Sequence, residues 1–343
     1  MSAPTDVRVG EYSVRVRPRP VVVVVVLLAL AVVLGAVALT LGEFPLPLSG
    51  VVDTLLGSGT RAQQFVVLEL RAPRVVLALV VGATLGVAGA VFQALARNAL
   101  ASPDLLGFTT GAASGALVAI VAFGAGALGT AGGAVVGVLV TAGIALALLG
   151  GETGGYRLVL VGIGLNAILY SLNNYLILRS DLSTASAAQT WLVGSLNGRD
   201  WTTVAVVGIG LVVLLVPALA VARRLDLLGM GDEAAGSIGV PVRSTRVVAL
   251  VVGVLLVGTA TAAVGPIAFV ALAAPQLARR LAGTTGPTMI ASGVLGGVLL
   301  LAGDVLGQRL AAPAQFPAGT MTASIGGLYL VWLLAREWKA DRG

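Results

Sequence analysis

The chain alternates between long apolar segments and short polar ones. An α-helix needs ~20 apolar residues to cross the ~30 Å core of a bilayer. By this measure ten spans are predicted, at 21–41, 71–96, 105–123, 127–149, 157–178, 202–222, 246–264, 267–283, 288–308 and 320–336. The eighth contains Pro266 and Pro275, so we expect it to be broken or partly re-entrant. The pattern predicts an all-α, polytopic membrane protein with ten transmembrane helices.

The first span has an alternative interpretation, as the apolar core of a signal peptide cleaved near Ala36-Val37-Ala38. Such a core is only ~7–15 residues long, whereas this apolar run fills 21–41. We therefore expect an uncleaved first helix. The predicted organisation is a tail at 1–20, one transmembrane domain at 21–336 with a polar loop at about 223–245, and a tail at 337–343.

The distribution of Lys and Arg predicts how the helices are oriented, because cytoplasmic loops carry an excess of both. With the N-terminus inside, 15 of the 21 Lys and Arg residues fall on the inner side. The outer segments hold the other six, which are Arg61, Arg71, Arg74, Arg179, Arg199 and Arg309. We expect a multi-pass protein of the cytoplasmic membrane with both termini in the cytoplasm.

Composition agrees with this class and excludes several others. Hydrophobic residues make up 57% of the chain and charged residues 10%, against roughly 25% charged in soluble domains. There is no Cys and no His, which excludes disulfides, thiolate or imidazole catalysis and Cys/His metal sites. The net charge of +6 is spread between apolar runs, so we expect a lipid bilayer rather than nucleic acid as the surroundings. No catalytic residue and no metal ligand is predicted.

The sequence contains no ATP-binding motif. A P-loop needs a lysine beside a glycine-rich turn, and the single lysine is Lys339, near the end of the chain. Gly124–Gly129 matches G-x-G-x-x-G, but it lies between two apolar spans rather than after a strand, and we interpret it as a tight helix connection. If ATP drives this protein, another chain must hydrolyse it, and this chain binds no cofactor.

Uncharged polar side chains within the spans have two possible roles. They are Gln93, Asn166, Asn173 and Asn174, and they either line a wet translocation pathway or make interhelical hydrogen bonds worth ~0.6–2 kcal/mol. We favour the hydrogen bonds for Gln93 and the pathway for the three asparagines. Charged groups within spans are rare, with Asp304 the main exception, which disfavours a proton-coupled transporter. A neutral lining suits a bulky, chelated solute better than a bare ion.

Small residues recur at intervals of four in the second span, at Gly82, Gly86 and Ala90. Residues at this spacing lie on one face of a helix, and small ones allow a neighbouring helix to approach closely. We therefore expect the second span to pack tightly against another helix through this face.

Three polar, irregular stretches carry motifs. The first begins Arg71-Ala-Pro-Arg74 and continues through Gln93 to Arg97-Asn-Ala-Leu-Ala-Ser-Pro-Asp-Leu-Leu-Gly107. The second is Trp191-Leu-Val-Gly194-Ser195, and the third runs from Leu225 through Gly229 to Val240. In this order they resemble the permease subunits of iron–siderophore and vitamin B12 ABC importers, the type II importer family, over residues 65–335.

The resemblance implies a ten-helix permease that works as a dimer. Its expected partners are a cytoplasmic ABC ATPase dimer, which binds the ATP, and an extracytoplasmic siderophore-binding protein that delivers a ferric siderophore. A second, related permease is favoured over a second copy of this chain. The preference for Arg over Lys and the abundance of Ala, Val and Gly point to a bacterial genome.

The resemblance also implies roles for particular residues. The stretch with Gly229, Asp232, Glu233, Ala235 and Gly239 corresponds to the coupling helices that contact the ATPases. Its glycines permit tight turns, and its two acidic residues suit the positive end of a helix dipole.

Arg71 and Arg74 correspond to cations that meet acidic residues of the binding protein, although either could simply anchor a helix at the headgroups. A third such arginine of the family falls at Gln308. The neighbouring Arg309 is our candidate, although a shift of one residue turns a helical side chain by ~100°.

Two further features resemble the ferric-enterobactin branch more than the B12 branch. They are Gln315 ahead of Pro317-Ala-Gly319, and Gly326-Gly327-Leu328. We expect the permease subunit of an ATP-driven importer of ferric siderophores, of the catecholate type. The alternatives are a permease for another chelate, a corrinoid or haem, and an ion-coupled secondary transporter. A membrane-embedded enzyme is disfavoured, because the chain has no His or Cys and few charged groups within its spans that could act in catalysis.

Overall fold

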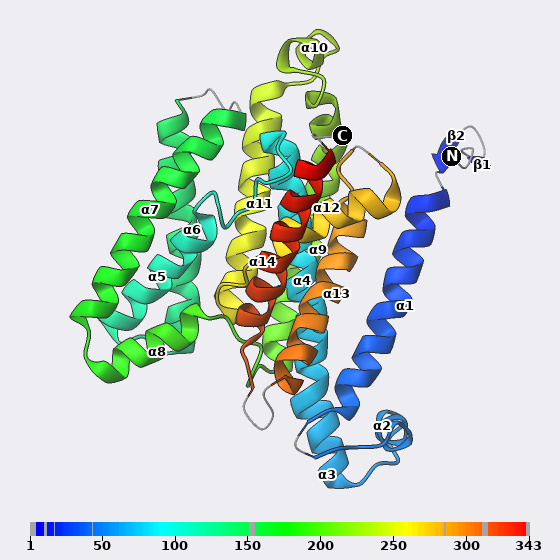
Figure 1. Ribbon diagram of the computed structural model, residues 1–343, viewed down its shortest axis with the longest axis vertical. Coiled ribbons are helices and arrows are strands. Elements are labelled where there is room, and N and C mark those ends of the chain that lie inside the picture. The colour runs from blue at the N-terminus through cyan, green and yellow to red at the C-terminus, as the bar shows by residue number, and fades with distance from the viewer. Residues whose placement is uncertain are drawn as a thin grey trace.

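The computed structural model describes residues 5–9, 12–16, 18–42, 44–150, 155–284, 286–310 and 315–340. They form a bundle of helices that run mostly along one axis (Figure 1). An antiparallel hairpin, β1 and β2, precedes the first helix. The elements are β1 Thr5–Val9, β2 Tyr12–Val16, α1 Pro18–Thr40, α2 Leu48–Leu55, α3 Arg61–Gln64, the π-helical segment η1 Phe65–Arg71, α4 Ala72–Ala96, α5 Phe108–Phe123, α6 Ala127–Leu149, α7 Gly155–Arg179, α8 Leu182–Leu192, α9 Trp201–Leu228, α10 Asp232–Ser237, α11 Val242–Val264, α12 Val270–Ala282, α13 Met289–Arg309 and α14 Ala318–Ala340.

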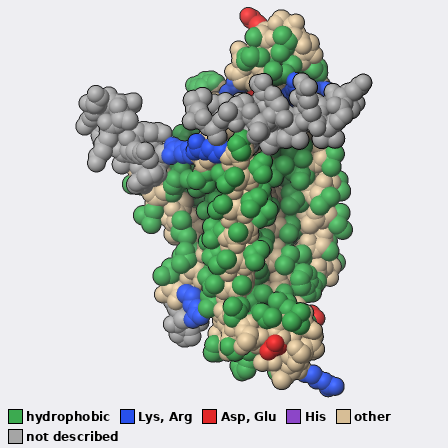
Figure 2. Space-filling view, turned by 90° about the vertical axis from the view of Figure 1, so that its right-hand side faces the viewer, with side chains coloured by type: hydrophobic (Ala, Val, Ile, Leu, Met, Phe, Trp, Pro, Cys, Tyr) green, Lys and Arg blue, Asp and Glu red, His purple; other side chains and the backbone are tan. Residues whose placement is uncertain are grey.

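The predicted ten-helix architecture is confirmed, because each predicted span overlaps one of these helices: α1, α4, α5, α6, α7, α9, α11, α12, α13 and α14. In the described part of the chain, seven helical segments are long and apolar enough to cross a membrane, and α5 and the apolar part of α14 are shorter. Hydrophobic side chains cover the middle of the face seen in Figure 2, and charged side chains gather toward its two ends. This distribution fits a protein surrounded by lipid at mid-height.

The eighth span is interrupted, as its prolines predict. Only Val270–Ala282 is helical, which is 13 residues or roughly 20 Å at 1.5 Å per residue. The segment before it, from Gly265 to Phe269, is not helical, and both of these residues have positive φ, +80° and +72°. Pro266 therefore lies ahead of the helix, whereas Pro275 lies within it.

Several elements differ from the sequence prediction. The second span continues back to Arg61 as one helical run of 36 residues, which the polar residues before Phe65 conceal in the sequence. The helix α8 is not predicted from the sequence, because it is rich in Ser, Thr and Ala and contains no apolar run. The last helix continues to Ala340, past the predicted end at 336. Of the predicted tails, residues 1–4, 10–11, 17 and 341–343 lie outside the described residues.

The face of α4 that carries small residues packs against α13. A Cβ added to Gly82 would lie 2.3 Å from the carbonyl oxygen of Gly296, and one added to Gly86 would lie 2.1 Å from that of Ser292. The two backbones are therefore in direct contact, which only glycine permits. This confirms the predicted tight packing and identifies the partner helix.

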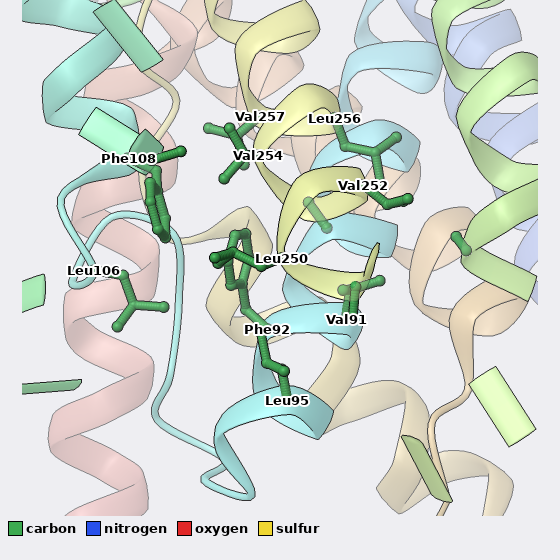
Figure 3. Close-up of a cluster of buried hydrophobic side chains, with 14 of the residues drawn as sticks. Val91, Phe92, Leu95, Leu106, Phe108, Leu250, Val252, Val254, Leu256 and Val257 are labelled. Carbon is green, nitrogen blue, oxygen red and sulfur yellow. The ribbon is translucent and has the colours of Figure 1, made fainter. Parts of the chain in front are cut away.

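A second contact region joins α4 to α5 and α11. The rings of Phe92 and Phe108 stack with centroids 5.2 Å apart, and Leu250, Val254 and Val257 of α11 complete the cluster (Figure 3). Because α4 packs on α9, α11, α12 and α13 as well, it is the central helix of the bundle.

The two ends of the bundle differ. One end carries α10, and the N-terminal hairpin and the last turns of α14 lie toward it (Figure 1); we name it the α10 end. The opposite end carries α2 and α3 and is named the α3 end. The first and last described elements, β1 and α14, therefore extend to the same end of the bundle (Figure 1).

Candidate functional site

The side chain of Arg74, at the α3 end, is bonded inside the bundle. Its Nε and Nη2 donate to the two carboxylate oxygens of Asp304 on α13, at 2.9 Å each. Asp304 is only 1% exposed, and Gln308 donates a further hydrogen bond to it at 2.8 Å. Arg74 Nη1 also donates to Asn197 and Gln315, at 3.3 and 3.4 Å. Arg74 therefore joins α4 to α13 and to two connecting segments.

Arg71 is bonded to the connection between α1 and α2. Its Nη1 donates to the carbonyl oxygen of Leu39 at 2.8 Å, and its Nη2 to that of Phe44 at 2.5 Å. A Cβ at Gly42, which has φ +140°, would lie 2.7 Å from Arg71 Nη2. The glycine thus makes room for the guanidinium, and Arg71 fixes the chain where α1 ends.

Arg71 and Arg74 line an open cavity of about 660 Å³ at the α3 end. Its polar lining also includes Asn197, Arg199, Gln308 and Gln315. Arg309 is exposed and is not part of this lining, whereas Gln308 is. The structure therefore brings two of the three predicted docking arginines together and adds Arg199, which the sequence does not distinguish from the other outer arginines.

The Trp191–Ser195 motif lies where three irregular segments meet. Gly194 has φ +70°, and a Cβ there would lie 2.0 Å from the carbonyl oxygen of Pro266. A Cβ on Gly319, at the start of α14, would lie 2.0 Å from the carbonyl oxygen of Val193. Ser195 N donates to Val264 O at 2.8 Å. This junction requires glycine and holds together the connections that precede α9, α12 and α14.

At the α10 end, Asp232 begins α10 and pairs with two arginines from other helices. Arg97, which ends α4 with φ +50°, donates to Asp232 Oδ1. Arg246 of α11, which is 5% exposed, donates to the same oxygen at 2.7 Å. The predicted coupling segment is thus bonded to α4 and α11. Arg97 and Arg246 are partners that the sequence alone did not reveal.

The other predicted coupling residues have different surroundings. Gly239 has φ +86°, as a tight turn requires. Gly229 lies in a hydrogen-bonded turn as well, but its φ of −57° does not require glycine, and the positive φ of this turn, +112°, falls at Gly231. Glu233 is exposed and Ala235 is fully buried.

Gln93 bridges α4 and α12. It is 3% exposed; its Nε2 donates to Leu272 O at 3.0 Å, and its Oε1 accepts from Arg279 Nη2 at 2.7 Å. A second glutamine, Gln276 of α12, donates to Ala99 O after the end of α4 at 2.7 Å. Both amides therefore make the interhelical hydrogen bonds that we favoured for Gln93.

The three asparagines lie on α7, most of whose surface is exposed. Asn166 accepts a hydrogen bond from Thr110 of α5. Asn173 is buried, and its Oδ1 has no hydrogen-bond partner among the described residues. Asn174 is exposed, as are the aromatic side chains of Tyr170 and Tyr175 on the same helix. The structure thus places polar groups on a helix with a large uncovered face.

Comparisons with known proteins agree with this arrangement. A family model described as the FecCD transport family matches residues 27–336. The chain is 42% identical to the ferric enterobactin transport system permease protein FepG of Escherichia coli over 89% of this chain and 93% of that protein. It is 36% identical to the Fe(3+) dicitrate permease FecD of the same organism, over 88% and 94%.

A solved structure has a similar fold. It is described as a metal-chelate type ABC transporter in an inward-facing conformation, and it superposes with a TM-score of 0.82. The sequence identity is 26%, and the match covers 92% of this chain and 99% of that chain.

Proposed function

Because the chain belongs to the FecCD transport family, we propose that it imports ferric siderophores of the catecholate type, as the permease subunit of an ATP-driven transporter. Its general class is established by the family: it is an ABC transporter permease for iron chelates and a multi-pass protein of the inner membrane. The catecholate assignment is supported by the 42% identity to a ferric enterobactin permease.

The observation that carries the proposal is the short helix α10 at one end of an apolar bundle. It is anchored by Asp232, and it is flanked by Met230 and Ile238, which are 60% and 58% exposed. Large apolar side chains that project outside the bundle mark a contact surface for another protein. We propose that this segment, with Gly229, Asp232, Glu233 and Gly239, docks on a separate ATPase dimer, which binds the ATP. Ala235 belongs to the same segment and packs beneath its surface.

This assignment sets the orientation of the whole chain. The α10 end, with both chain termini, is then cytoplasmic, and the α3 end receives an extracytoplasmic siderophore-binding protein. Arg71, Arg74 and Arg309 remain the proposed docking cations. The uncovered face of α7, with Asn174, then faces a related permease across the translocation pathway. Asn166 and Asn173 stay proposed pathway residues of the same helix, although Asn173 is buried within this chain. Gln93 bridges two helices behind that pathway.

Reconstituted uptake tests the function. The chain is placed in proteoliposomes with an ABC ATPase, a second FecCD-family permease and a siderophore-binding protein from the same organism, and radioactive iron is followed. We expect uptake of ferric enterobactin that requires ATP on the ATPase side and is lost with a hydrolysis-deficient ATPase. Uptake that needs only a proton gradient would contradict the ATP-driven mechanism. Uptake of ferric citrate, a ferric hydroxamate, haem or cobalamin in place of ferric enterobactin would contradict the catecholate assignment.

The coupling assignment has its own test at Gly239. The residue has φ +86° and open space around it, so Gly239→Arg disturbs the turn and the docking surface without a clash inside the bundle. We expect the variant to lose co-purification of the ATPase. If co-purification and transport-coupled hydrolysis both persist, the assignment of this segment is wrong.

A further inference from the structure

Arg199 separates two open cavities at the α3 end. One is the cavity of about 660 Å³ that Arg71 and Arg74 also line. The other, of about 460 Å³, lies between the adjacent ends of α6, α9 and α11. Arg199 and Asp200 belong to the lining of both cavities. They therefore form the ridge between the two cavities, just ahead of α9.

Arg199 differs from the two neighbouring arginines, because no residue in the described part of the chain accepts a hydrogen bond from it. Arg74 is paired with Asp304, and Arg71 donates to two carbonyl oxygens. The Nε of Arg199 is buried and has no hydrogen-bond partner among the described residues. Burial accordingly lowers the pKa of Arg199, against a smaller opposing effect of the Asp200 charge.

One oxygen of the adjacent carboxylate is already engaged. Asp200 Oδ1 accepts from the backbone N of Thr203 at 2.9 Å and from its hydroxyl at 2.7 Å, which caps the N-terminus of α9. These hydrogen bonds lower the pKa of Asp200 and orient its side chain toward the helix. Arg199 is thus a partly desolvated cation in a cavity wall, and its buried Nε has no acceptor among the described residues.

We propose that Arg199 receives a carboxylate side chain of the extracytoplasmic binding protein and is the main cation of that docking surface. A guanidinium binds a carboxylate through two parallel hydrogen bonds, and a charge pair shielded from water contributes more than one at an exposed rim. Arg71 and Arg74 would have to give up internal partners to do the same. The inference rests on the proposed function, since it presumes that such a protein docks at this end.

The test measures the affinity of the purified binding protein for the complete transporter in nanodiscs. Arg199→Gln removes the charge and is expected to weaken binding at least about tenfold, while Arg199→Lys recovers part of the loss because it restores only a point charge. Arg61→Gln is the matched control: it removes an exposed charge from the same end, outside both cavities. It is expected to change affinity less than about twofold.

The outcomes separate this inference from the proposed function. If the binding protein docks on the wild type and equally well on Arg199→Gln, the role of Arg199 is wrong and the proposed function stands. If the binding protein docks neither on the wild type nor on Arg199→Gln, the proposed function itself is contradicted. Inorganic phosphate alone is a further probe. If it raises the melting temperature of the wild type but not of Arg199→Gln, and docking is unchanged, a small anion occupies the site and the inference is overturned.

Discussion

Arg74 and Asp304 form a bidentate ion pair between α4 and α13, with both N···O distances at 2.9 Å. From the sequence alone, the two residues have separate roles. Arg74 is taken as an outer docking cation, and Asp304 as the main charged group within a span. The structure makes them two halves of one interaction, and Gln308 completes it. The charge of Arg74 is therefore largely neutralised inside the chain.

The first prediction concerns the stability of this pair. Arg74→Met leaves Asp304 buried without its partner, and breaking a buried pair from one side costs about 3–5 kcal/mol. We expect a clear fall in the melting temperature of the purified protein in detergent. The double variant Arg74→Met/Asp304→Leu removes both charges and should recover most of the loss. A melting temperature of Arg74→Met equal to that of the wild type would show that the pair does not stabilise the fold.

The second prediction concerns the contact of α4 with α13. Gly86→Ala places a Cβ 2.1 Å from the carbonyl oxygen of Ser292, so the helices must separate, and we expect a loss of about 1–3 kcal/mol. Gly143→Ala is the control, because nothing lies within 4 Å of a Cβ at that position on α6. It should be neutral or slightly stabilising, since Ala favours helix over Gly by up to ~1 kcal/mol. Equal thermal stability of the two variants would contradict the close approach.

The sequence predicts the helices well because apolar length is a local property. It locates all ten spans, anticipates the break near Pro266, and identifies the glycine face of α4. It misses α8, whose residues are mostly polar or small, and the short helix α2, and it begins the second span at Arg71 although the helix starts at Arg61. Helices outside the apolar spans are therefore the part of the fold that hydropathy does not predict.

The sites are predicted less completely, because their partners are distant in sequence. Asp232 is recognisable within its motif, but Arg97 lies 135 positions earlier, and nothing in one sequence joins them. The same holds for Arg199, since what distinguishes it is a buried Nε without an acceptor among the described residues, which only the three-dimensional structure reveals. Residue type and spacing suggest which groups matter, and the fold decides which of them are free to bind a partner.

The third prediction concerns the role of Gln93. Gln93→Leu leaves the carbonyl oxygen of Leu272 and the guanidinium of Arg279 without their shared partner, and we expect a loss of about 1–3 kcal/mol. Asn174→Leu, at an exposed position on α7, should leave the melting temperature unchanged and reduce uptake. If Gln93→Leu instead unfolds like the wild type and only uptake changes, Gln93 lines the pathway and does not act as a bridge.

The last prediction concerns the joint between α10 and the bundle. Asp232→Asn keeps the shape of the side chain but removes the charge that holds Arg97 and Arg246 together, so α10 is no longer fixed to α4 and α11. Since a movement of the ATPase reaches the bundle through α10 in the proposed mechanism, we expect iron uptake per ATP hydrolysed to fall at least about tenfold, while hydrolysis itself continues. Glu233→Gln changes the same charge one residue away, at an exposed position with no ion pair among the described residues. Asp232→Glu should restore part of the coupling, because it restores the charge. If Asp232→Asn and Glu233→Gln transport equally well per ATP, the ion pairs of Asp232 stabilise the fold without transmitting the movement.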